Sequence, residues 1–88
     1  MANKRSLKRA IHGICDELFA EAMALSLYGA KEQKENAKSQ LSAIVKMEEE
    51  FICRVSHPEP GMKASLYFKD LGEKFLAQAS DIIDQMNG

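Results

Sequence analysis

Two residues that could do chemistry together stand near the start of the chain. His12 and Asp16 are four residues apart, which places both side chains on one face of an α-helix. With a third ligand such as Glu49 they could bind a metal ion, because imidazole and carboxylate groups are common metal ligands. The chain lacks the paired ligands of structural zinc sites and the Glu-x-x-His spacing of di-iron bundles. We therefore interpret the two residues as a surface pair and predict no metal ion and no cofactor.

Glu48 is the most unusual acidic residue, because it falls near the middle of an otherwise apolar helix face. A carboxylate in that position must be paired, hydrogen-bonded or protonated. In one interpretation the helix is rotated slightly and Glu48 reaches an edge lysine such as Lys69. In the other, Glu48 is a buried polar group that fixes helix register or lines a ligand or metal site with His12 and Asp16.

Cys15 and Cys53 lie on or beside apolar helix faces. If the chain reverses near residue 31, Cys15 comes level with about Met47, which is roughly 9 Å along the helix axis from Cys53. A disulfide needs closer Cα atoms, so we expect two reduced thiols that act as small buried apolar groups. Reduced cysteines agree with a cytoplasmic location.

Four basic residues gather at the start of the first predicted helix: Lys4, Arg5, Lys8 and Arg9. Cations are unfavourable at the N-terminal end of a helix dipole, so a nucleic-acid or other anionic partner is one explanation. The other is a solvated helix end balanced by nearby acids such as Glu59. The chain has 12 basic and 13 acidic residues and no aromatic residues among the basic ones. These features argue against nucleic acid as a partner.

The elements that would position these residues are three helices of nearly equal length. Apolar residues recur at steps of three and four in each, and the spacing predicts helices over about 5–28, 33–56 and 61–86. Gly29 ends the first helix as a left-handed stop, and Pro58 and Pro60 end the second. Short connections make neighbouring helices antiparallel. The sequence thus predicts an all-α, antiparallel three-helix bundle with the first helix at its centre.

A second apolar stripe on the first helix is formed by Phe19, Met23 and Leu27. Met62 and Leu66 also fall off the main apolar face of their helix. A small monomer has little core to absorb five extra large apolar side chains. Either they widen the core around the first helix, or they form an exposed patch that marks an interface. We predict the second arrangement, with dimerisation through the first helix and Met62 and Leu66 joining the patch.

The overall composition supports one soluble domain over residues 1–88. Apolar residues make up 45% of the chain and charged residues 28%, which is typical of a globular protein. The chain contains no apolar run of the roughly 20 residues that a membrane span needs. The basic start is not followed by the apolar run of a signal peptide, so we expect a cytoplasmic protein.

Two stretches together resemble a family of small, uncharacterised helical proteins from bacterial genomes. They are ANKRSLKRAIHGICDELFAEAMALSLYG and CRVSHPEPGMKASLYFKDL, and the segment around His57–Gly61 is the most distinctive part. The resemblance implies a bacterial, single-domain, all-α protein. It carries no activity, ligand or catalytic residue to this chain.

Three functional hypotheses follow, in this order. The first is a non-enzymatic protein-interaction or structural module that self-associates, most simply as a homodimer. The second is a small nucleic-acid or regulatory binding protein that uses the basic start of the first helix. The third is a ligand or metal site near Glu48, His12 and Asp16. No set of residues predicts a catalytic site.

Overall fold

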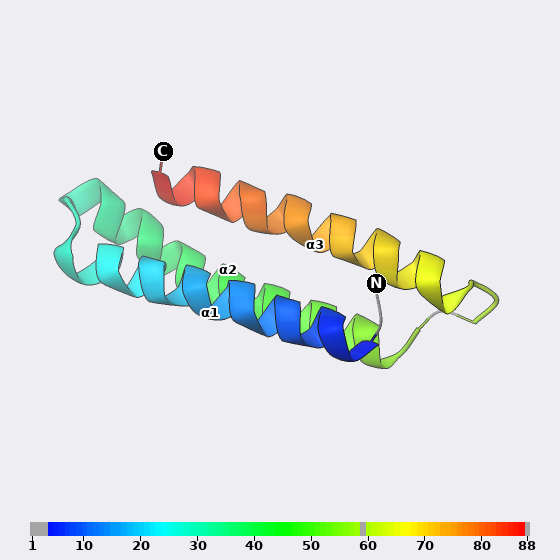
Figure 1. Ribbon diagram of the computed structural model, residues 1–88. Coiled ribbons are helices and arrows are strands. Elements are labelled where there is room, and N and C mark those ends of the chain that lie inside the picture. The colour runs from blue at the N-terminus through cyan, green and yellow to red at the C-terminus, as the bar shows by residue number, and fades with distance from the viewer. Residues whose placement is uncertain (1–3, 59, 88) are drawn as a thin grey trace.

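The computed structural model describes residues 4–58 and 60–87, which form three helices: α1 (Lys4–Tyr28), α2 (Lys31–Ser56) and α3 (Ala64–Asn87). The chain runs along the bundle, returns and runs along it again, so consecutive helices are antiparallel (Figure 1). The molecule is elongated, with principal extents of 48 × 19 × 18 Å. The predicted all-α three-helix bundle is confirmed.

The turn between α1 and α2 is tight. The backbone N–H of Gly29 donates to the carbonyl oxygen of Leu25 at 3.0 Å, and that of Ala30 donates to Oε1 of Gln33 at 2.9 Å. Because Gln33 caps this end, α2 begins at residue 31 rather than at the predicted residue 33. A Cβ atom on Gly29 would lie 2.6 Å from the Leu25 carbonyl oxygen. Glycine is needed there for space, and the predicted left-handed conformation is wrong, since Gly61 is the only described residue with a positive φ.

The connection between α2 and α3 is longer than the sequence predicts. Gly61 has a φ of +87°, which a right-handed helix cannot contain, so α3 starts at Ala64 and not at residue 61. The first turn of α3 is attached to the last turn of α2 by Tyr67, whose hydroxyl donates to the carbonyl oxygen of Arg54 at 3.0 Å. Pro58 ends α2 as predicted.

The core lies on the axis between the three helices, and no polar or charged side chain among the described residues is buried in it. Within it the rings of Phe51 and Phe75 meet edge to face, with centroids 5.3 Å apart. The buried apolar residues are Ile11, Cys15, Leu18, Ala22, Ala37, Ile44, Met47, Phe51, Val55, Phe68, Leu71, Phe75, Ala79, Ile82 and Met86.

Helix α2, not α1, is the central element. It packs extensively on α1 and substantially on α3, whereas α1 and α3 contact each other least. The sequence suggested α1 because that helix is apolar over more of its circumference. Phe19, Met23 and Leu27 nevertheless stay exposed, so only one of the two apolar stripes of α1 lies in the core.

Candidate functional site

His12 of α1 and Glu48 of α2 form a hydrogen bond across the two helices. The Nδ1 atom of His12 lies 3.1 Å from Oε2 of Glu48, and the side chains are 53% and 30% exposed respectively. Glu48 therefore sits at the edge of the core and is neither buried nor paired with Lys69. Its edge position agrees with the first of the two interpretations, but its partner is His12, which the sequence paired with Asp16.

The His12–Glu48 pair has no further metal ligand beside it among the described residues. Asp16 is exposed one turn after His12, and within residues 4–58 and 60–87 no three histidine, cysteine or acidic side chains come together to hold a metal ion. Asp16 and Glu48 instead line a hollow of about 250 Å³ between α1 and α2, together with Cys15, Phe19, Ile44 and Val45. Two opposed carboxylates beside apolar side chains offer a cation too few ligands.

Cys15 lies at the base of that hollow and is buried, as predicted. Burial, with smaller contributions from the carboxylates of Glu48 and Asp16, raises the pKa of the Cys15 thiol to about 11. A thiol with so high a pKa is protonated at neutral pH and is a poor nucleophile, because the thiolate is the reactive form. Cys15 is therefore a poor candidate for a nucleophile.

Cys53 is free and exposed, so its prediction as a small buried group is wrong. It lies on the solvent side of α2, because the helix turns Phe51 and Val55 toward the core on either side of it in sequence. The two cysteines form no disulfide, as the helix register predicted.

The basic cluster Lys4, Arg5, Lys8 and Arg9 occupies the first two turns of α1. Lys4, Arg5 and Lys8 border a hollow of about 420 Å³, and the first turn of the helix contains no acidic residue. Glu59, which the sequence analysis considered as a balancing acid, lies outside the described residues. The cluster is therefore accessible, but no aromatic side chain stands among its four cations to stack on a base.

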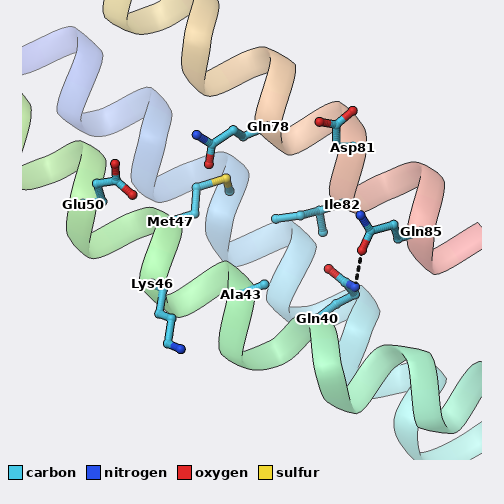
Figure 2. Close-up of a pocket in the computed structure, with 9 residues that line it drawn as sticks. All are labelled: Gln40, Ala43, Lys46, Met47, Glu50, Gln78, Asp81, Ile82 and Gln85. Carbon is cyan, nitrogen blue, oxygen red and sulfur yellow. Dashed lines mark hydrogen bonds between the residues drawn. The ribbon is translucent and has the colours of Figure 1, made fainter.

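A polar hollow of about 290 Å³ lies between α2 and α3 (Figure 2). Nε2 of Gln40 donates to Oε1 of Gln85 at 2.6 Å across its mouth, and Glu50 is paired with Arg54 at 2.6 Å. Sequence reasoning singled out none of these residues, because glutamines and paired charges on a helix surface give no distinctive pattern. The amide nitrogen of Gln40, the amide oxygen of Gln85 and the carboxylate of Glu50 thus already have partners within the protein.

The predicted interface residues do not form one surface. Phe19 lies on the edge between α1 and α2 beside Val45, and Met23 and Leu27 follow one and two turns further along α1. Met62 borders a different hollow with Arg54 and Tyr67, at the end of the bundle where α2 connects to α3 (Figure 1). The prediction that Met62 and Leu66 join the α1 patch is thus wrong, because the first turns of α3 lie at the opposite end from Leu27.

A more apolar groove separates α1 from α3, and sequence reasoning missed it. Its volume is about 420 Å³, and its apolar lining includes Ile14 and Leu18 of α1 with Leu76 and Ile83 of α3. Leu76 and Ile83 are exposed. Glu17, Glu21 and Ser80 form its polar rim. The spacing of Leu76 and Ile83, which are one heptad apart, is the signal that could have revealed it.

Comparison with protein-family models, with curated proteins and with solved structures finds no match for this chain. The resemblance to a family of small bacterial helical proteins stays a prediction. In the described part of the chain, no helix combines the length and apolarity that crossing a bilayer requires.

Proposed function

We propose that this protein is a non-enzymatic interaction module that self-associates through α1, most simply as a homodimer. The observation that carries this proposal is the exposed apolar edge between α1 and α2. Phe19 and Met23 of α1 and Val45 of α2 are each about two-fifths exposed (38%, 39% and 41%). Large apolar side chains gathered on one edge of a soluble bundle are typical of a protein interface.

A two-fold axis near Met23 would bring this edge onto itself. Phe19 would then face Leu27 of the second copy, and Met23 would face its own counterpart. In such an isologous contact every apolar residue of the stripe has an apolar partner. The two ends of the stripe, Phe19 and Leu27, are eight residues apart, or roughly 12 Å of helix at 1.5 Å per residue.

The dimer should be weak, because the monomer already buries much of these side chains. Full burial of a large apolar side chain contributes about 1.5–3 kcal/mol, so the remaining two-fifths of Phe19 or Met23 contributes roughly 1 kcal/mol. Six such side chains in a dimer supply roughly 6 kcal/mol, against an association cost of order 4–15 kcal/mol. The net gain is then at most about 2 kcal/mol, so the stripe alone gives a weak dimer that we expect to be populated only at the highest protein concentrations.

The test is sedimentation equilibrium of the Phe19→Glu/Met23→Glu variant over a range of concentrations. We expect a monomer with unchanged helix content, because both side chains already reach solvent. The matched control is Ala10→Glu/Tyr28→Glu, which adds the same charge at two exposed positions about 100° or more around α1 from the stripe and should leave the association unchanged. Wild-type protein that stays monomeric at the highest concentration contradicts the proposal. A Phe19→Glu/Met23→Glu variant that unfolds shows that the stripe belongs to the monomer core.

A further inference from the structure

Helix α3 carries a second, solvent-facing strip that the core does not use. Its six residues are spaced alternately three and four apart, which is the spacing of a coiled-coil seam. All six are exposed. The strip consists of Leu66, Lys69, Glu73, Leu76, Ser80 and Ile83.

We propose that this strip pairs, antiparallel, with the same strip of a second copy of the chain. This interface is separate from the α1 stripe and goes beyond the function proposed above. The strip borders the apolar groove between α1 and α3, which Leu76 and Ile83 line. A second α3 laid on the strip would occupy the position of a fourth helix and cover the groove, where α1 and α3 contact each other least.

The order of residues along the strip makes it complementary to a second copy of the strip that runs in the opposite direction. A two-fold axis that passes midway along the strip, between positions 74 and 75, pairs position 66 with position 83 of the second copy. Leu66 then packs on Ile83, and Leu76 packs over the aliphatic stem of Glu73. Leu66 and Leu76 are 55% and 57% exposed, so each has more surface left to bury than Phe19 or Met23 has.

Charge favours the same arrangement. The antiparallel register places Lys69 level with Ser80 of the second copy, and Ser80 lines the groove together with Glu17 and Glu21. The ion pairs found within residues 4–58 and 60–87 involve neither Lys69 nor these two glutamates. A parallel pairing would instead set Lys69 against Lys69 and Glu73 against Glu73, which is repulsive.

The register predicts a specific cross-link. In a Cys53→Ser background, Lys69→Cys protein mixed with Ser80→Cys protein should form a disulfide-linked dimer under mild oxidation. Neither variant should cross-link alone. In this register position 69 of one copy lies eleven residues, or roughly 16 Å along the helix axis, from position 69 of the other copy, and the same holds for position 80. Glu35→Cys mixed with Lys46→Cys is the matched control, since both positions are exposed on α2 and are also eleven residues apart. Lys69→Cys that cross-links to itself, or a mixture that reacts no more than the control, overturns the proposal.

Charge exchange provides a test that leaves the bundle intact, because Lys69 and Glu17 are both exposed. Lys69→Glu should weaken the association measured by sedimentation roughly tenfold, since each dimer loses two charge pairs and gains repulsion. Adding Glu17→Lys should restore it, and a lack of restoration contradicts the predicted contact. Leu76→Glu should abolish the mixed cross-link, whereas Phe19→Glu/Met23→Glu should leave it unchanged. Failure of this interface is therefore distinguishable from failure of the α1 stripe.

Discussion

Helix α1 packs against α2 along one edge and faces α3 across the other, and the two edges are built differently. On the α2 side, core side chains interlock and the His12–Glu48 hydrogen bond joins the two helices, while Phe19 and Val45 stay exposed further along the same edge. On the α3 side, Leu76 and Ile83 stand exposed over a groove. Both edges of α1 are apolar in sequence, so the apolar pattern alone does not decide on which side α1 packs more closely. The helix that is covered on both sides by neighbours is α2.

The largest expected effect is a difference in stability loss between a substitution in the core and one at the open groove. Phe51→Ala should destabilise the protein by about 3–5 kcal/mol, because Phe51 is fully buried and loses its edge-to-face contact with Phe75. Leu76→Ala, at 57% exposure, should change the free energy of unfolding of the monomer by less than about 1 kcal/mol. Urea unfolding at a dilution that keeps the chain monomeric measures both. Similar losses for the two variants would show that the groove is as tightly packed as the core.

An intermediate effect is expected at high pH on the α1–α2 edge. The pKa of Cys15 is raised from 9.0 to about 11 in the folded chain, so the folded state holds this proton more tightly than the unfolded state. The stabilisation is complete below about pH 9 and is lost as the pH rises to about 11, by about 2–3 kcal/mol in all. The measurement is the pH dependence of unfolding of wild type relative to Cys15→Ala, in which tyrosine and lysine titrations cancel. Parallel stability curves for the two proteins across this range would contradict the assignment.

The smallest expected effect concerns the His12–Glu48 hydrogen bond on the same α1–α2 edge. Glu48→Leu should raise the free energy of unfolding by no more than about 1 kcal/mol, which appears as a slightly higher melting temperature. The reason is that a partly exposed pair contributes little, whereas leucine extends the apolar face. Glu49→Leu, one position along on the exposed face of α2, is the control and should show no gain. A clear loss of stability in Glu48→Leu, measured by thermal unfolding, would mean that the His12–Glu48 pair specifies how α1 sits on α2.

Part of the candidate surface was predictable from residue spacing. The periodicity of three and four predicted each helix to within three residues at either end, and it marked Phe19, Met23 and Leu27 as off the main stripe. The start of α3 was misplaced because the left-handed conformation of Gly61 follows from the geometry of the connection, to which a helical pattern is insensitive. The place of Leu76 in the groove was not predicted. A single leucine beside a buried stripe lines a groove only because α1 lies next to it, and the sequence pattern of α3 does not show where α1 lies.

By itself the sequence determined that this chain makes three amphipathic helices joined by short turns, because hydrophobic periodicity, prolines and glycines act over a few residues. The tertiary structure alone decided that α2 is central, that Glu48 meets His12, and that Met62 lies apart from Phe19. Those outcomes depend on the rotation and axial offset of one helix against another. Both quantities are set by how side chains from all three helices interlock, and no local stretch of sequence contains that information.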